Sequence, residues 1–182
     1  MPARKPTKQE LASAITETID DLIDHDLRIL FCGINPGLYS GATGLHFARP
    51  GNRFWKGLHL SGITARLLDP SEGNELLEGG VGITCFVSRT TARADELSKE
   101  EFVIGGNILR AKLEKYRPRM LAVLGIGAYR MAFDRPKATV GQQDEKIGDT
   151  RVWLLPNPSG LNANYQLADI ARLFAELRSE VE

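Results

Sequence analysis

The stretch RILFCGINPG, residues 28–37, decides how this chain is expected to fold. Its first seven residues form a short and almost continuous apolar run, which is typical of a parallel strand buried on both faces. Asn35, Pro36 and Gly37 end the run at once, because proline fixes its own backbone and restricts the residue before it to extended conformations. We therefore expect a buried strand that ends in a rigid turn.

Three further apolar runs follow along the chain and alternate with helical patterns. They predict strands at 81–87, 120–124 and 150–155, and helices at about 8–24, 52–60, 99–116, 126–133 and 166–181. The Gly-rich segment 38–51 is expected to be a loop. Strands that alternate with helices predict an α/β fold, in which helices cover both faces of a parallel sheet.

The length and composition fit one globular domain. Of the 182 residues, 42% are hydrophobic and 25% are charged, which is ordinary for a soluble fold. No repeat or linker is visible, so we expect a single domain over 1–182, with 1–7 as a flexible arm. No stretch approaches the roughly 20 apolar residues of a membrane span. We expect a soluble, cytoplasmic monomer.

The charges exclude a broad basic surface. The chain has 23 Lys and Arg against 23 Asp and Glu, whereas proteins that hold DNA through such a surface carry an excess of basic residues. Contact with nucleic acid is therefore expected to be local. Two cysteines are too few for an all-cysteine iron–sulfur cluster, and the three histidines show no metal-ligand spacing. We expect no metal and no cofactor.

Two unusual loops follow predicted strands, at the edge where parallel sheets bind ligands. In the first, the Asn35 amide can donate and accept hydrogen bonds and so hold a water, although it is no strong base; asparagine is also a common turn former. In the second, NPSGL at 157–161, Leu161 is a large apolar side chain among turn residues. Leu161 either fills the gap left by an extruded nucleotide or anchors the loop to the core.

Taken together, the two loops resemble those of the mismatch-specific branch of the uracil-DNA glycosylase superfamily. GINPG at 33–37 resembles the first motif of that branch, and NPSGL at 157–161 resembles the second. The similarity covers about 28–175 and includes 43–44, 47–48, 52–56, 89–91 and 97–100. Both motifs stand in order at matching strand ends, which makes the resemblance specific.

The resemblance implies a three-layer α/β/α sandwich around a four-stranded, mostly parallel sheet. It implies a monofunctional DNA glycosylase of base excision repair, which flips uracil, and thymine or etheno-cytosine, out of mismatches with guanine. The enzyme would hydrolyse the N-glycosidic bond and leave an abasic site. Its partner would be double-stranded DNA that contains G:U or G:T mismatches.

The resemblance also implies roles for individual residues. Asn35 would position the attacking water, and Phe47 would stack on the flipped base. The base edge would meet backbone groups near Gly33, Ile34 and Leu38, and the duplex would meet Ser159, Gly160 and Leu161. Gly37 stands where the uracil-only branch carries a bulky tyrosine, so the pocket should admit larger bases. Asn157, a predicted base-binding residue, stands where that branch carries a histidine, so a neutral imidazole donor to the leaving base is absent.

Some positions have more than one interpretation. Arg49, Arg53 and Lys56 could contact DNA phosphates or form a solvated helix face. Asp95 stands where bacterial relatives of this branch carry asparagine. Its carboxylate could act as a general base or stabilise the cation that develops on the sugar; alternatively, it is an exposed charge favoured by a helix dipole. Ala163 stands where those relatives carry arginine, so the grip on DNA is expected to be weaker.

Two other functions remain open at this stage. One is a non-catalytic module that binds DNA lesions through Phe47 and Leu161 but does not cleave them. The other is an α/β enzyme that binds a free nucleotide, for which Gly125 and Gly127 give weak support because Arg130 occupies the third glycine position of the pattern. Cleavage of a uracil-containing oligonucleotide would separate the first alternative from a glycosylase.

Overall fold

A five-stranded sheet forms the centre of the computed structural model, which describes residues 4–182. The strands are β1 (Ile29–Gly33), β2 (Val81–Cys85), β3 (Met120–Leu124), β4 (Gly141–Ile147) and β5 (Thr150–Leu155), in the order β2-β1-β3-β5-β4. Four of them are parallel, at the positions that the apolar runs predict. The expectation of a four-stranded sheet is wrong, because β4 joins β5 as an antiparallel edge strand.

The added strand β4 has no apolar run that could predict it. Its sequence, GQQDEKI, alternates between half-buried and exposed positions until Ile147. An edge strand needs only one neighbour and keeps a solvated face, so polar residues are tolerated there. Gly148, with φ of +61°, makes the tight turn that returns the chain into β5.

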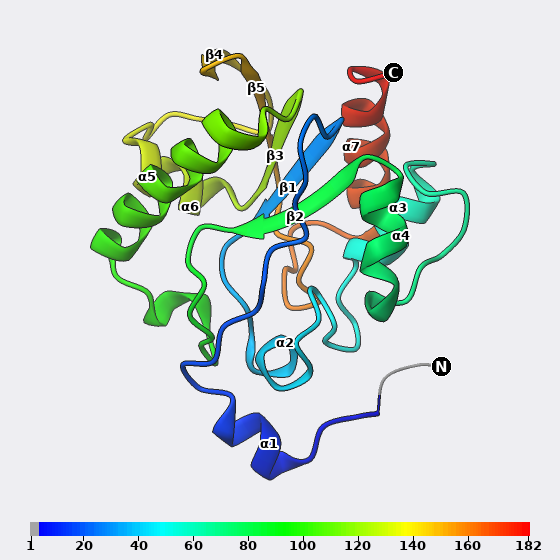
Figure 1. The fold of residues 1–182 in the computed structure, drawn as a ribbon, viewed down its shortest axis with the longest axis vertical. Coiled ribbons are helices and arrows are strands. Elements are labelled where there is room, and N and C mark those ends of the chain that lie inside the picture. The colour runs from blue at the N-terminus through cyan, green and yellow to red at the C-terminus, as the bar shows by residue number, and fades with distance from the viewer. Residues whose placement is uncertain (1–3) are drawn as a thin grey trace.

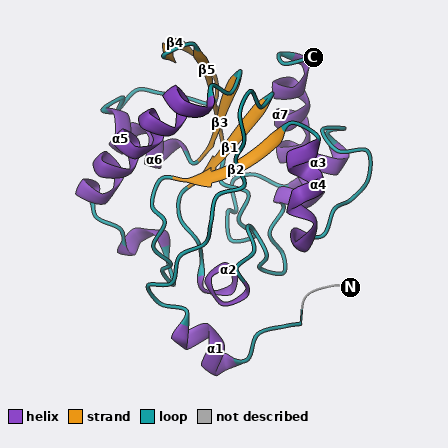
Figure 2. Cartoon of the chain, in the orientation of Figure 1, coloured by secondary structure: helices purple, strands orange, loops and turns teal. Residues whose placement is uncertain are grey.

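Helices cover the two faces of the sheet and complete the expected three-layer sandwich (Figure 1). One face carries α3 (Phe54–Leu60), α4 (Gly73–Glu78) and α7 (Leu167–Ser179), and the other carries α5 (Lys99–Tyr116) and α6 (Ile126–Phe133) (Figure 2). Two short helices, α1 (Lys8–Ser13) and α2 (Leu38–Thr43), pack together beyond the carboxyl ends of the strands. The α/β/α architecture is therefore confirmed.

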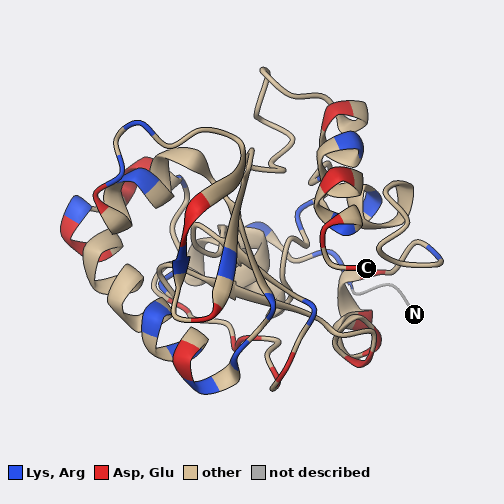
Figure 3. Ribbon diagram, turned by 90° about the horizontal axis from the view of Figure 1, so that it is seen from above, with Lys and Arg blue, Asp and Glu red and all other residues tan. Residues whose placement is uncertain are grey.

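Charged residues of both signs are distributed over the outer helices. Figure 3 shows Lys and Arg interspersed with Asp and Glu around the rim of the molecule. Among the helices within residues 4–182, none is both long and apolar enough to cross a bilayer.

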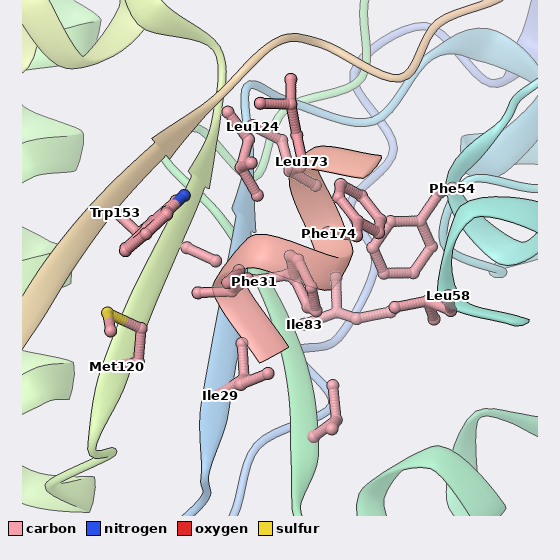
Figure 4. Packing of buried hydrophobic residues seen from close by; sticks show 14 of the residues in the cluster. Ile29, Phe31, Phe54, Leu58, Ile83, Met120, Leu124, Trp153, Leu173 and Phe174 are labelled. Atoms are coloured by element: carbon pink, nitrogen blue, oxygen red, sulfur yellow. The ribbon is translucent and has the colours of Figure 1, made fainter. Parts of the chain in front are cut away.

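The alternation of strand side chains divides the core into two layers. Ile29 and Phe31 of β1 pack on the α3 and α7 side, whereas Leu30 and Cys32 pack on the α5 and α6 side. Figure 4 shows the first layer, where Phe31 meets aromatic rings from both helices. Each fully buried side chain of this kind contributes about 1.5–3 kcal/mol. The strand ends are thus fixed from both faces and form a rigid base for the loops that leave them.

The N-terminal segment differs from its prediction. The expected helix at 8–24 ends at Ser13, and the following residues run alongside the outer edge of β2. Thr16 adopts φ of +72°, which no helix allows, and its N–H donates to the Thr90 carbonyl at 3.3 Å. The unpaired backbone of a sheet edge outcompetes the helical spacing of the apolar residues.

Other helix predictions are confirmed. Ser98 and Glu101 form the expected capping box at the start of α5, and α6 and α7 fall within their predicted ranges. The segment 38–51, expected to be a loop throughout, contains α2. Of the arm expected at 1–7, residues 1–3 lie outside the described residues, and Thr7 caps α1 in a box with Glu10.

Candidate active site

The two loops singled out by the sequence face one cavity. GINPG leaves the end of β1 and NPSGL leaves the end of β5, with β3 between these strands. β1 is also where the strand order reverses, the usual position of a ligand crevice in such sheets. The cavity has a volume of about 610 Å³. Its lining includes all the predicted site residues except Gly160 and Arg53: Gly33, Ile34, Asn35, Gly37, Leu38, Phe47, Asp95, Asn157, Ser159 and Leu161.

Asn35 is held by one end of its amide group. Its Nδ2 donates to the carbonyl of Arg89 at 2.9 Å, to Thr91 Oγ1 at 2.8 Å and, less directly, to the Pro36 carbonyl at 3.2 Å. No donor within residues 4–182 reaches Oδ1, and that oxygen is not buried. The orientation leaves an acceptor free in the cavity, as a residue that holds a water requires.

Thr91 was missed as a functional residue. It is 2% exposed, and its hydroxyl donates to the Arg93 carbonyl at 2.8 Å while it accepts from Asn35. The Thr91 hydroxyl donates its one proton to the Arg93 carbonyl, so it can only accept from the Asn35 amide. It therefore fixes the Nδ2 end of that amide toward Thr91. The resemblance at 89–91 was the available signal, but the pairing is visible only in three dimensions.

Phe47 lines the same cavity in a strained conformation. Its φ is +51°, a value unusual for a residue other than glycine. The ring packs against Phe54 with a centroid distance of 4.2 Å and an interplanar angle of 30°. A Cβ at Gly33 would lie 3.2 Å from the Phe47 ring. Gly33 therefore lets the ring approach the strand end, and strain of this kind is typical of functional positions.

Gly37 leaves space that a side chain would fill. A Cβ built there meets no atom within 4 Å, and φ of −79° is open to any residue. The glycine is therefore not required by the backbone. The missing side chain leaves open space in the cavity, and the admission of larger bases stays a prediction.

The NPSGL loop is held by the buried Pro158 and by hydrogen bonds from Arg53. The Arg53 guanidinium donates to the carbonyls of Pro158, Ser159 and Tyr165, and to that of Asn162 at 3.0 Å. These bonds occupy the group that was expected to contact phosphate. Arg53 thus positions the loop, and its contact with DNA stays a prediction. Of its basic neighbours, Arg49 lines the cavity and Lys56 is exposed on α3.

Gly160 and Leu161 form the tip of this loop. A Cβ at Gly160 would lie only 2.6 Å from the Gly51 carbonyl oxygen, so the close approach of the two loops requires glycine. Leu161 is 75% exposed, which rules out the interpretation that it anchors the loop to the core. The tip presents an apolar side chain to solvent from a rigid base.

Asn157 uses only half of its amide within the loop. Its Oδ1 accepts from the Ser159 N–H at 2.9 Å, and the Nδ2 donor finds no acceptor within residues 4–182 and is not buried.

Asp95 lies at the cavity rim in a short 3-10 helix, Ala94–Glu96. Its side chain is 72% exposed and pairs with Arg93 at 3.1 Å. The carboxylate is therefore within the site but not locked in one position by burial.

Comparison with known proteins agrees with this geometry. Residues 20–179 match the family model described as the Uracil DNA glycosylase superfamily. The chain belongs to the uracil DNA glycosylase superfamily. Among solved structures, it is similar to the solution NMR structure of a candidate uracil DNA glycosylase from Methanosarcina acetivorans, with a TM-score of 0.60 and 18% identity over 90% of this chain and 99% of the other. At that identity the likeness concerns the fold.

Membership in this superfamily indicates a DNA glycosylase, a hydrolase of DNA repair. The cavity at the ends of β1 and β5 is accordingly the candidate glycosylase site. The arrangement also weakens the alternative of a free-nucleotide enzyme built on the glycines at 125–127, because Gly125 and Gly127 do not line the cavity.

His46 is a further lining residue of the glycosylase pocket that the sequence did not single out. It is 5% exposed, and burial lowers the pKa of its imidazole. Its Nε2 lies 2.8 Å from the Asp20 carbonyl; because a carbonyl only accepts, Nε2 carries the proton. The neutral ring then keeps a lone pair on Nδ1 as an acceptor.

The thiols of the glycosylase are unsuited to nucleophilic chemistry. Burial raises the pKa of the Cys32 thiol well above its usual range and that of Cys85 to about 12. Both remain protonated at neutral pH, and a thiol rather than a thiolate is a poor nucleophile. No group of three or more potential side-chain ligands within residues 4–182 is arranged to hold a metal ion.

Proposed function

We propose that this glycosylase is monofunctional and mismatch-specific, and that it excises uracil, and thymine or etheno-cytosine, opposite guanine in double-stranded DNA. The observation that carries the proposal is the convergence of Asn35, Phe47 and the NPSGL loop on one cavity. Water-positioning, base-stacking and duplex-probing groups are what an enzyme needs to act on an everted base.

The base is proposed to stack on Phe47 beside the end of β1. Phe47 would supply the stacking ring, and backbone groups near Gly33, Ile34 and Leu38 would contact polar atoms of the base edge. Gly37 leaves room for a 5-methyl group or a larger adduct. In this assignment the pocket selects by shape and stacking and does not exclude substituted pyrimidines.

The reaction is proposed to be hydrolysis at C1′ of the sugar. A water on Asn35 Oδ1 adds to C1′ as the C1′–N1 bond breaks, the bonding electrons leave with the base, and the water gives up a proton. Asp95 is the proposed acceptor of that proton. The free Nδ2 of Asn157 is a donor for the negative charge that builds on the departing base.

Leu161 is proposed to occupy the space that the everted nucleotide leaves in the duplex. Its side chain is 75% exposed at a loop tip that Arg53 holds in place, and apolar wedges of this kind stabilise unstacked DNA. Gly160 and Ser159 would meet the opposite strand. The contact is small, in line with a chain of zero net charge.

The proposal is tested with duplexes that carry uracil, thymine, hypoxanthine or etheno-cytosine opposite each of the four bases. We expect strand breaks after alkali treatment, strongest opposite guanine and severely reduced in Asn35→Ala. Binding of the duplexes without any cleavage would favour a lesion-binding module instead.

The role of Asp95 is tested by Asp95→Ala under single turnover. A general base contributes about a hundredfold or more, and an exposed one is expected at the lower end of that range. Glu100→Ala is the control, because Glu100 is a nearby exposed carboxylate and does not line the cavity. An unchanged rate in Asp95→Ala would remove this residue from the mechanism.

A further inference from the structure

The segment 11–20 contributes a wall of the cavity that lies outside both motif loops. Leu11 and Ile19 line the cavity, although both precede β1 by many residues. Their side chains are apolar and half-buried. They cannot offer hydrogen bonds to a ligand, so they act on it by shape alone.

Backbone hydrogen bonds fix this segment in place. The Thr16 N–H donates to the Thr90 carbonyl at 3.3 Å, and the Thr90 N–H donates to the Glu17 carbonyl at 2.9 Å. Thr18 forms an antiparallel bridge with Arg89. The same residues 89–91 hold the Asn35 amide. The segment is therefore attached to the part of the chain that positions the proposed water.

His46 fixes the other end of the segment beside the stacking ring. Its Nε2 donates to the Asp20 carbonyl at 2.8 Å, and its ring centroid lies 6.5 Å from that of Phe47. Ile19 therefore directly precedes Asp20, the residue that His46 holds beside the Phe47 ring. Leu11 lies in α1. This helix packs against α2, which begins with Leu38 (Figure 1).

From this arrangement we propose that Leu11 and Ile19 are specificity-determining residues that set the largest base the pocket admits. The inference rests on the proposed function, because it assumes that an everted base occupies this cavity. Gly37 leaves the pocket open on one side, and the segment 11–20 closes another. The balance between these two features determines whether bulky adducts fit.

The test compares single-turnover cleavage of etheno-cytosine and of uracil, each opposite guanine. Ile19→Ala and Leu11→Ala are expected to raise the ratio of the etheno-cytosine rate to the uracil rate roughly tenfold, the scale on which apolar pockets discriminate by size. Ile19→Phe is expected to lower the same ratio. Because the two kinds of variant shift it in opposite directions, a general loss of stability cannot imitate the result; melting temperatures are recorded for each protein.

Ile15→Ala is the matched control. Ile15 belongs to the same segment but is 53% exposed and does not line the cavity, so its variant should keep the wild-type ratio. If uracil is cleaved and the ratio is unchanged in Ile19→Ala and Ile19→Phe, or shifts equally in Ile15→Ala, this inference is overturned while the proposed function stands. If the wild type cleaves no uracil, the proposed function fails and the inference fails with it.

Discussion

The hydroxyl of Thr91 and the amide of Asn35 form a pair in which each donor has a defined acceptor. Thr91 gives its proton to the Arg93 carbonyl and receives one from Asn35 Nδ2 at 2.8 Å. Without the hydroxyl, the Asn35 amide would lose one of its anchors and could rotate its oxygen out of the cavity. Thr91 is in this sense a positioning residue, because it acts on the proposed water through Asn35.

Thr91→Val keeps the shape of the side chain and removes the hydroxyl. We expect the single-turnover rate to fall about tenfold, because a hydrogen bond of this kind contributes about 1 kcal/mol or somewhat more, while affinity for the mismatched duplex is retained. Thr91→Ser restores the hydroxyl and should recover most of the rate. Equal rates for the valine and serine variants would show that the amide orientation does not depend on Thr91.

A functional residue can be predicted from the sequence when it belongs to a short motif of neighbouring residues. Asn35 and Leu161 stand in short motifs, and the structure brings both to the cavity. Thr91 and His46 owe their positions to contacts with distant segments, through Asn35 in one case and Asp20 in the other. No local pattern carries that information.

The NPSGL loop shows how one side chain can organise an element. Arg53 stands at the start of α3 and reaches four carbonyls of the segment that follows β5. A planar guanidinium has five N–H donors in fixed directions, whereas a lysine ammonium is a single point with three. Pro158 is the one buried residue of the loop, and its largest apolar side chain, Leu161, is exposed.

Arg53→Lys should therefore loosen the loop without unfolding the sheet. We expect duplex cleavage to drop about tenfold or more, while the melting temperature falls by only a few degrees, the scale of a 1–2 kcal/mol loss in a domain of this size. Leu60→Ala, at an exposed position of the same helix that does not line the cavity, is the control. Full duplex activity in Arg53→Lys would mean that the loop holds its shape without the arginine.

The difference between buried strands and edge elements explains which elements the sequence could predict. Strands β1, β2, β3 and β5 are buried on both faces, so their apolar runs are continuous and predictable. β4 and the segment 14–22 lie at the two edges of the sheet, where pairing with one neighbour decides the structure. Polar residues obscured the first and a helical spacing obscured the second. Edge elements depend on what they meet in space, and a sequence pattern does not show that.

Across the whole molecule, charged side chains stabilise the starts of helices more than they form a continuous binding surface. Glu72 and Glu101 both accept a backbone N–H as the last residue of a capping box, and both accept an arginine, Arg66 and Arg89 respectively. These hydrogen bonds, the arginine ones first, lower the pKa of each carboxyl from 4.5 to about 2. Arg89 also supplies the carbonyl that holds Asn35.

These depressed pKa values predict acid sensitivity with a definite direction. A carboxyl whose folded-state pKa lies below its unfolded value stabilises the fold above pH 4.5, and that stability is lost as the pH falls from 4.5 toward 2. We expect the free energy of unfolding in urea to decline through this window. Glu101→Gln should be less stable at pH 7 and should decline less steeply below pH 4.5, because it has no carboxylate to protonate. Glu100→Gln, at the neighbouring exposed position of α5, should follow the wild type. Parallel pH profiles for Glu101→Gln and the wild type would contradict the assignment of this sensitivity to the Arg89–Glu101 pair.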